Sequence, residues 1–257
     1  MDIVIIGAGN IAWCYGQQLR LNGHVVKQVI SRQEAHAQAL GDALNAEWTT
    51  DLLNINMEAD VYLLCVADDA LATLNDELRL GRRMVAHTAG AVPLSAIGRI
   101  STHTGVVYPL QSIRKENKNY PEIPIIIEAS NEDTLRRLQS LAQSISPRVT
   151  QADSAHRLQL HLAAVLANNF TNHLLTLAKS RCQEQGLDFS LLQPIIRETF
   201  DRLEKFGPEN VQTGPALRGD QHTMALHESL LADKPLQLEV YKVLSASIAE
   251  FYRVGRE

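Results

Sequence analysis

The feature that most constrains this chain is a glycine-rich turn near its N-terminus, which joins an apolar run to a helical pattern. The turn has the form G-x-G-x-x-A and reads Gly7-Ala8-Gly9-Asn10-Ile11-Ala12. We expect a strand at Ile3–Ile6 before it and a helix at Ile11–Leu21 after it. In that context Gly7 permits the tight turn, Gly9 lets the backbone approach a pyrophosphate, and Ala12 lets the helix pack closely on the sheet. The start of the helix then offers free N–H groups and a positive dipole to phosphates. The turn therefore predicts a dinucleotide site; the alternative is a turn that needs small residues only for packing.

The residues that follow the second expected strand, Val25–Ile30, indicate which dinucleotide binds. An NAD site usually has Asp or Glu there, about 20 residues after the glycines, to hold the ribose 2′-hydroxyl. This chain has Ser31 and Arg32 instead, and Glu34 already lies in the next turn. A hydroxyl and a planar guanidinium suit a 2′-phosphate dianion. We therefore predict NADP(H) as the cofactor, with an ordinary solvated arginine as the alternative for Arg32.

Strand-like and helix-like segments alternate through the first half of the chain. This alternation predicts an α/β fold with a doubly wound, mostly parallel sheet of the Rossmann type. Val61–Val66 is a nearly unbroken apolar run, as expected of a central strand that is buried on both faces. Further strands are expected at Met84–His87, Gly105–Tyr108 and Pro124–Glu128, and further helices at Glu34–Leu44, Leu71–Leu78 and Asn131–Ile145. We assign residues 1–152 to this NADP-binding domain.

From about Asp153 onward the strand-like alternation disappears and helical patterns follow. The expected helices are Ser154–Gly186, Leu191–Phe206, a short one that Asp220 caps, and Leu236–Arg253. We assign residues 153–257 to an all-helical substrate and dimerisation domain. A long helix that is apolar around its whole circumference needs cover on all sides. A small helical domain offers little cover within one chain, so we expect a homodimer.

The composition disfavours several other classes of protein. The formal net charge is −5 and no basic stripe runs along the chain, so neither nucleic acid nor an anionic membrane is an expected partner. No stretch reaches the ~18 apolar residues of a membrane span, and Met1 leads into the first strand without a signal peptide. Three scattered cysteines fit a reducing compartment, so we expect a cytoplasmic location. No metal is expected, because His156 and His161, like His222 and His227, are five residues apart and lie on different helix faces.

Six segments spread along nearly the whole chain carry a resemblance to a known family. They are Gly7–Ala12, Cys65–Ala70, His87–Gly90, Tyr108–Gln111, the helix with His161 and Asn168-Asn169-Phe170, and Gly214-Pro215 with Arg218-Gly219-Asp220. Together they resemble the Rossmann-plus-helical-domain oxidoreductases related to pyrroline-5-carboxylate reductase and F420-dependent NADP oxidoreductase. Within that group the chain is most similar to NADP oxidoreductases that carry a domain of unknown function called DUF2520. The resemblance implies a second domain of the 6-phosphogluconate dehydrogenase C-terminal-like type.

The resemblance also implies where the cofactor lies. Val66, Ala67 and Asp68 would end the fourth strand beside the ribose and nicotinamide. Thr88 and Gly90, with Tyr108, would line the nicotinamide pocket. All of these positions fall at the carboxyl ends of expected strands, where ligands bind in open α/β sheets. The alternative for Asp68, Thr88 and Tyr108 is that each is a loop residue without a ligand.

The long helix carries the candidate catalytic residues. His161, Asn168 and Asn172 fall at i, i+7 and i+11, so they would share one polar stripe of a regular α-helix. Relatives in the β-hydroxyacid dehydrogenase group have Lys-x-x-Asn-Asn here, but Val165 occupies the lysine position in this chain. We therefore take His161 as the candidate acid or base, because imidazole exchanges a proton near neutral pH. Asn168 would orient the acceptor; the alternative is a histidine that only fixes the angle between the domains.

Arg218 is the third candidate catalytic residue, because it precedes the Asp220 cap in a loop framed by proline and glycine. It could bind a substrate carboxylate, pair with a second subunit, or remain a plain surface arginine. We expect an NADP(H)-dependent oxidoreductase that moves a hydride to or from a small carbonyl or imine. The alternative is an NADP(H)-binding regulatory or sensor protein without turnover, which the valine in place of lysine motivates. An F420-linked reductase is less favoured, because no deazaflavin site is identifiable.

Overall fold

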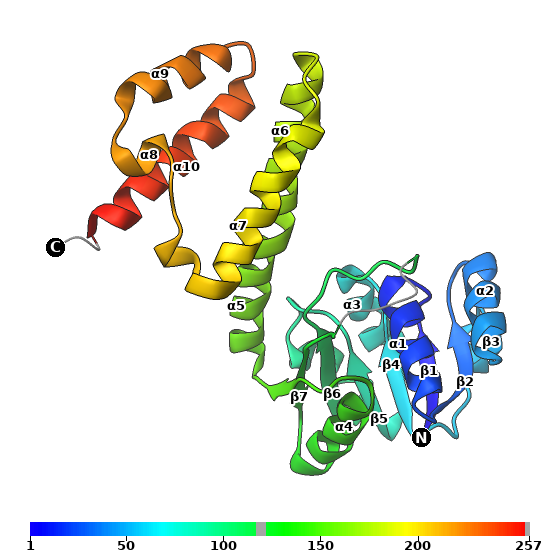
Figure 1. Ribbon diagram of the computed structural model, residues 1–257. Coiled ribbons are helices and arrows are strands. Elements are labelled where there is room, and N and C mark those ends of the chain that lie inside the picture. Colours follow the sequence, from blue (N-terminus) through cyan, green and yellow to red (C-terminus); the bar gives the residue numbers. More distant parts are fainter. Residues whose placement is uncertain (117–121, 255–257) are drawn as a thin grey trace. The chain divides into compact units, whose positions relative to one another are not determined.

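The computed structural model describes residues 1–116 and 122–254, and the chain divides into two compact units, Met1–Phe170 and Thr171–Glu257 (Figure 1). The expected domain boundary after residue 152 falls earlier than this division. The difference arises because the first part of the long helix packs with the sheet and belongs to the first unit.

The first unit is built on an eight-stranded sheet with the order β3-β2-β1-β4-β5-β6-β7-β8. Its strands are β1 (Asp2–Ile6), β2 (Val25–Ile30), β3 (Glu47–Thr49), β4 (Val61–Leu64), β5 (Gly81–His87), β6 (Ser101–Pro109), β7 (Ile125–Ala129) and β8 (Val149–Gln151). Strands β1 to β6 are parallel to one another, whereas β7 pairs with β6 antiparallel and β8 runs parallel to β7. The expected doubly wound, mostly parallel sheet is confirmed. The three-residue strands β3 and β8 were not predicted, because they are too short to show a period.

Helices cover both faces of this sheet. They are α1 (Asn10–Leu21), α2 (Glu34–Leu44), α3 (Asp68–Glu77) and α4 (Glu132–Ile145). Alternate residues of β1 point to opposite faces: Ile3 and Ile5 join the core under α1, α2 and α4, while Val4 and Ile6 join the core under α3. As expected, the Asn131 side chain caps α4 by accepting the Thr134 N–H at 2.9 Å. A central strand buried on both faces explains why its sequence is apolar without alternation.

The carboxyl ends of the parallel strands meet at one edge of the sheet. In the strand register Ile6 pairs with Ile30 and Leu64, Leu64 pairs with His87, and His87 pairs with Val106. Every predicted cofactor-binding residue lies in the loop or at the helix start that follows the carboxyl end of a parallel strand. The exception is Tyr108, which is the second-last residue of β6. The edge is where an open parallel sheet binds its ligand.

The long helix is not one regular α-helix. It consists of α5 (Ser154–Ala164), a π-helical segment over Val165–Phe170, and α6 (Thr171–Glu184). A π-turn closes i→i+5 hydrogen bonds and so holds more residues than an α-turn. Each residue of this segment is therefore rotated about the helix axis by less than in an α-helix, so Asn168 does not reach the angular position that 3.6 residues per turn would give it. The prediction that His161, Asn168 and Asn172 share one stripe is wrong for this reason.

The second unit contains only helices among its described residues. After α6 come α7 (Gln193–Phe206), α8 (Pro215–Arg218), α9 (Gln221–Leu230) and α10 (Pro235–Val254). Asp220 caps α9 as expected, since its carboxylate accepts the Thr223 N–H at 3.0 Å. Within residues 1–116 and 122–254, no helix is both long and apolar enough to cross a membrane.

Candidate functional site

The glycine-rich turn follows β1 and presses against the neighbouring strands. Gly7 has φ +109°, and a Cβ at this position would lie 2.1 Å from the carbonyl oxygen of Cys65. The N–H of Gly7 donates to the carbonyl of Ile30 at 2.7 Å. A positive φ and a backbone contact this close both require glycine. The turn is therefore fixed between the ends of β2 and β4.

Gly9 and the first turn of α1 have the features that a pyrophosphate needs. A Cβ on Gly9 would meet nothing within 4 Å, so the space beside this residue is open. Gly9 is the N-cap of α1, and no side chain caps the helix. The N–H groups of the first turn, which begins with Asn10, Ile11 and Ala12, therefore stay free for an anion. These residues fit a bound dinucleotide.

The end of β2 lacks the acidic residue of an NAD site. Ser31 is half-buried and its N–H donates to the Thr49 carbonyl at 3.2 Å. Arg32 is exposed, and it makes no hydrogen bond or ion pair with the described residues, 1–116 and 122–254. A guanidinium with all its donors free can take a phosphate in a bidentate contact.

The ends of β4 and β5 are joined through the Thr88 side chain. Thr88 is buried, and its hydroxyl donates to the Leu64 carbonyl at 3.4 Å. Val66 is half-buried, whereas Ala67 and Asp68 are exposed at the start of α3. Of these four predicted residues, Ala67 and Asp68 thus present the most accessible side chains, and Thr88 serves as a link between two strands.

Gly90, Tyr108 and His161 meet at the same edge of the sheet, although they come from three separate segments. The Tyr108 hydroxyl lies 3.0 Å from Nδ1 of His161, and the two rings are arranged edge to face with centroids 5.9 Å apart. A Cβ on Gly90 would lie 2.7 Å from His161 Nδ1 and 2.8 Å from the Tyr108 ring. The sequence predicted all three residues for the site, but not that they are in direct contact.

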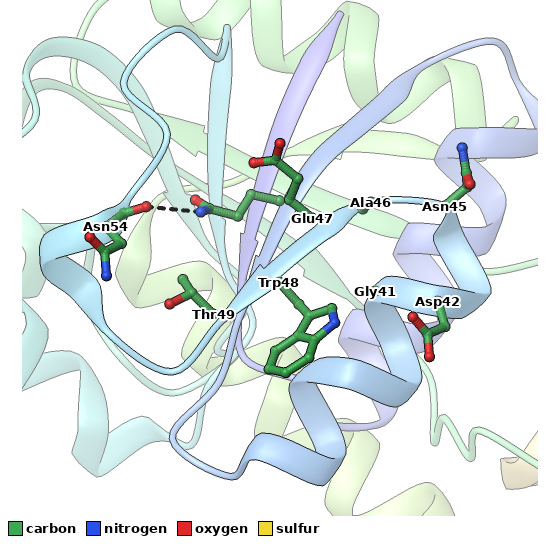
Figure 2. Close-up of a pocket in the computed structure, with 9 residues that line it drawn as sticks. Gly41, Asp42, Asn45, Ala46, Glu47, Trp48, Thr49 and Asn54 are labelled. Carbon is green, nitrogen blue, oxygen red and sulfur yellow. Dashed lines mark hydrogen bonds between the residues drawn. The ribbon is translucent and has the colours of Figure 1, made fainter.

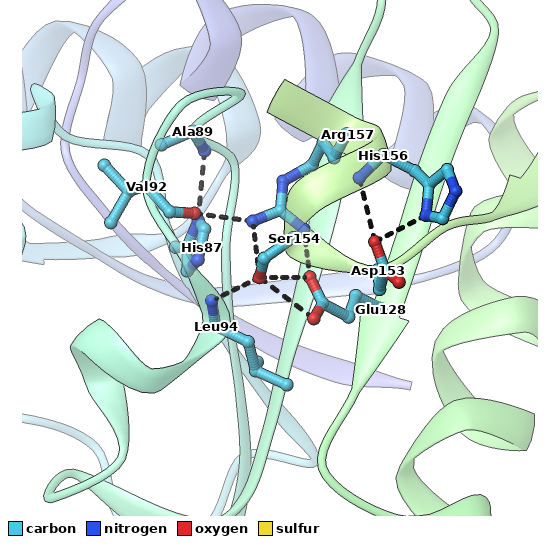
Figure 3. A network of polar contacts seen from close by, with 9 residues as sticks. All are labelled: His87, Ala89, Val92, Leu94, Glu128, Asp153, Ser154, His156 and Arg157. Carbon is cyan, nitrogen blue, oxygen red and sulfur yellow. Dashed lines mark hydrogen bonds and ion pairs between the residues drawn. The ribbon is translucent and has the colours of Figure 1, made fainter. Parts of the chain in front are cut away.

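A buried polar network holds the first turn of α5 against the sheet (Figure 3). Arg157 is fully buried and forms an ion pair with Glu128 of β7. Its guanidinium also donates to the carbonyl of Val92 at 2.5 Å. The Ser154 hydroxyl donates to the Glu128 carboxylate and accepts the Leu94 N–H at 3.0 Å. A buried charge that loses its partner is strongly destabilising, so this pair sets the position of α5 in the first unit.

His87 is a second buried polar group next to this network. Its Nδ1 accepts the Ala89 N–H at 3.2 Å, and its Nε2 has no hydrogen-bond partner among the residues that the structure describes. Burial lowers the pKa of His87 to about 4, and the Arg157 cation lowers it in the same direction. His87 is therefore neutral at physiological pH and shapes the loop that carries Thr88 and Gly90.

Burial also controls the other titratable groups near the strand ends. It raises the pKa of Tyr108, with the Arg157 cation opposing that rise and the Asp68 carboxylate adding to it. It raises the pKa of the Cys65 thiol to about 12, so this cysteine is no nucleophile at neutral pH. Among the described residues no three His, Cys, Asp or Glu side chains are grouped to hold a metal.

The structure assigns no contact with this cluster to the other two predicted catalytic residues. Asn168 is exposed in the π-helical segment beside half-buried Val165. Arg218 belongs to the second unit, where it is exposed at the end of α8. Their roles remain predictions.

Two hollows of the first unit lie away from the predicted residues. One, of about 810 Å³, is bounded by α2, β3 and the segment after it, and includes Asp42, Glu47 and Trp48 (Figure 2). The other, of about 800 Å³, lies between the end of β8 and α5, and includes Asp153 and His156. Neither hollow contains a residue that the sequence assigned to the cofactor or to catalysis. The candidate site thus rests on chemistry at the strand ends and not on cavity size.

The buried network of Arg157, Glu128 and Ser154 was not predicted from the sequence. Arg157 and Glu128 are separated by 29 residues, so no local pattern joins them. One signal was present, because Arg157 lies four residues before His161 and therefore on the same helix face. The spacing therefore indicated that Arg157 lies next to His161 on the helix.

Comparisons with known proteins agree with this geometry. The family model described as "NADP oxidoreductase coenzyme F420-dependent" matches residues 2–88, and the domain of unknown function DUF2520 matches residues 123–248. The solved structure of "putative NADP oxidoreductase BF3122" from Bacteroides fragilis is 38% identical, with a TM-score of 0.89, and covers 97% of this chain and 98% of its own. The chain belongs to this family of NADP-dependent oxidoreductases. The resemblance and the cofactor that the sequence predicted are both confirmed.

More distant solved structures share the fold. A 1-pyrroline-5-carboxylate reductase from Streptococcus pyogenes is 10% identical with a TM-score of 0.64, over 97% of this chain and 98% of its own. A reductive aminase from Aspergillus terreus, solved with NADPH and ethyl-5-oxohexanoate, is 15% identical with a TM-score of 0.74, over 99% of this chain and 94% of its own. No curated protein matches the chain.

Proposed function

We propose that this oxidoreductase reduces a small carbonyl or imine with NADPH, and that His161 donates the proton that accompanies the hydride. The observation that carries the proposal is the meeting of Gly90, Tyr108 and His161 at the carboxyl edge of the sheet. This edge is where the cofactor of an open α/β sheet lies. An imidazole placed there can act as a general acid.

The remaining predicted residues have assigned places in this proposal. The pyrophosphate would lie at the turn of Gly7 and Gly9, at the start of α1. Ser31 and Arg32 would hold the 2′-phosphate of the cofactor. Val66, Ala67 and Asp68 would flank the ribose, and Thr88 would support the nicotinamide loop. When bound, NADPH supplies the hydride; the protein has to orient the acceptor and deliver a proton.

The proposed substrate class is based on the chemistry of hydride transfer and on the structure of a distantly similar reductive aminase. A hydride acceptor that also needs a proton is a polarised C=O or C=N group. The Aspergillus terreus reductive aminase was solved with ethyl-5-oxohexanoate, a molecule with a ketone. Asn168 would orient this group and Arg218 would bind a substrate carboxylate. We also propose a homodimer through the helical unit and, from three unpaired cysteines, a cytoplasmic location.

The test is NADPH oxidation by the purified protein across a panel of oxo acids, aldehydes, ketones and cyclic imines. We expect turnover with at least one member, and we expect His161→Asn to reduce kcat by about 10²–10⁴-fold, the usual contribution of a general acid. NADPH affinity and melting temperature should stay close to those of the parent. NADPH binding without turnover on any substrate would contradict the proposal and favour a sensor. A fall in melting temperature that accounts for the lost activity would make His161 structural.

A further inference from the structure

The two ring nitrogens of His161 have different surroundings. Nδ1 lies 3.0 Å from the Tyr108 hydroxyl, whereas Nε2 has no hydrogen-bond partner within residues 1–116 and 122–254. A neutral imidazole carries its proton on one nitrogen and accepts at the other. When the Tyr108 O–H donates to Nδ1, the proton of His161 is on Nε2. The free nitrogen is therefore the one that can give a proton away.

A neutral imidazole is a poor acid by itself, because losing the Nε2 proton would leave an imidazolate anion. The loss becomes feasible when Nδ1 gains a proton in the same step. The Tyr108 hydroxyl is the only group within hydrogen-bond distance of Nδ1 among the described residues. We propose that Tyr108 and His161 form a two-residue proton relay, in which Tyr108 resupplies the proton that His161 delivers.

The relay rests on the proposed function, because it needs a hydride acceptor that takes up a proton. The hydride from NADPH reaches the carbon of the C=O or C=N group, and the oxygen or nitrogen takes the proton from His161 Nε2. Nδ1 takes the proton of the Tyr108 hydroxyl, so the histidine ends neutral and the tyrosine ends as a phenolate. The oxidised cofactor, the alcohol or amine and the phenolate are the products. Solvent protonates the phenolate before the next turnover.

The charges that face Tyr108 suit this transfer. The Arg157 guanidinium from α5 favours negative charge on the phenol, while Asp68 from α3 opposes it. Tyr15 from α1 is a further ionisable neighbour; it is buried and uncharged, and its hydroxyl donates to the Val107 carbonyl at 3.2 Å. His161 is the acceptor itself. Because burial raises the pKa of Tyr108, the phenol also stays protonated at mildly alkaline pH and can serve as a donor there.

Arg157 is the positioning residue of the relay. It lies one turn before His161 on the same face of α5, and its ion pair with Glu128 holds that turn to β7 (Figure 3). Gly90 closes the other side, because a Cβ there would overlap both rings. The contact between Tyr108 and His161 is thus set by buried groups on both sides.

The test compares the pH dependence of kcat at saturating NADPH for the parent and for Tyr108→Phe. The matched control is Tyr62→Phe, since Tyr62 is also buried and its hydroxyl donates to the Asn56 carbonyl at 2.7 Å, away from the strand ends. We expect the parent and the control to stay active into the alkaline range. Tyr108→Phe has to use the imidazolium as its acid, so its kcat should fall as the pH rises, because only the protonated ring can then give a proton away.

A second variant tests the effect of the Arg157 charge on the Tyr108 phenol. Arg157→Met combined with Glu128→Gln removes both members of the buried pair and leaves no unpaired ion. We expect the Tyr108 phenol, measured as the tyrosinate absorbance difference between variants with and without Tyr108, to titrate at higher pH than in the parent. We also expect kcat to fall across the whole pH range.

The outcomes separate the relay from the proposed function. A Tyr108→Phe profile that runs parallel to the parent's at a lower level would overturn the relay and leave the reductase intact. An unchanged Tyr108 titration in the double variant would overturn the role of Arg157. A parent without turnover on any substrate would end both proposals.

Discussion

The two units of this protein differ in how they bury their apolar side chains. In Met1–Phe170, side chains from the sheet and from both helical layers, such as Ile5 of β1, Leu19 of α1 and Leu71 of α3, are buried. Among the side chains described in the second unit, Ala216 is the only buried hydrophobic residue. Leu191 is 74% exposed there, Ile195 64% and Leu236 76%.

The difference shows which unit can hold side chains in fixed positions through its own core. The first unit has such a core, and it brings the glycine turn, Arg32 and the Tyr108–His161 pair to one sheet edge. The second unit exposes apolar surface that a monomeric soluble protein rarely leaves open. A second copy of this chain is the partner that we propose for that surface.

The largest effect that this comparison predicts concerns the helical unit. In the dimer that we propose, an aspartate in place of Ile195 would put an unpaired charge into the interface, at a cost of about 3–5 kcal/mol per buried charge. We expect Ile195→Asp to shift light scattering from twice 28.5 kDa toward 28.5 kDa. Lys205→Asp, which places the same residue at an exposed polar position of α7, should remain dimeric. A parent that is monomeric at micromolar concentration would remove the contrast between the units.

A smaller effect is expected from a buried group of the first unit. The pKa of His87 is lowered from 6.5 in the unfolded chain to about 4 in the folded one. The unfolded state therefore binds the proton first as the pH falls. The stability that this histidine contributes is full above pH ~6.5 and is lost as the pH drops toward ~4, by about 3 kcal/mol in total.

The variant that checks this prediction is His87→Asn, whose Oδ1 can still accept the Ala89 N–H. We expect the free energy of unfolding of the parent to fall between pH 6.5 and 4 more steeply than that of His87→Asn. Parallel curves for the two proteins would show that His87 does not bear this pH dependence.

The same contrast explains what the sequence could and could not predict. The sheet unit was predictable because β1 and β4 contain short apolar runs next to turns, and because Gly7 and Gly9 have conformational and spatial requirements that the spacing reveals. The π-helical segment was not, since Val165–Phe170 has no proline or glycine to mark a change of helical period. Its presence invalidates the stripe on which Asn168 was placed.

The candidate site was predictable in its residues but not in its contacts. Tyr108 and His161 were each assigned to it from strand ends and from helix chemistry. Their pairing at 3.0 Å spans 53 residues, and the Arg157–Glu128 ion pair spans 29. Contacts over such separations depend on the packing of the whole unit, which no local pattern carries. The apolar residues of the helices in the second unit predicted that another surface packs against them, but not which surface.

Calorimetric titration of the parent and of Arg32→Ala with NADPH and NADH needs no substrate and tests the cofactor site itself. We propose that the first unit carries the NADP(H) site and that Arg32 contacts the 2′-phosphate there. Hydrogen bonds to charged groups contribute about 1.5–3 kcal/mol, so Arg32→Ala should weaken NADPH binding about 10- to 150-fold and change NADH binding little. The parent should prefer NADPH. A parent that binds NADH more tightly, or an Arg32→Ala variant that keeps the full affinity for NADPH, would contradict the account.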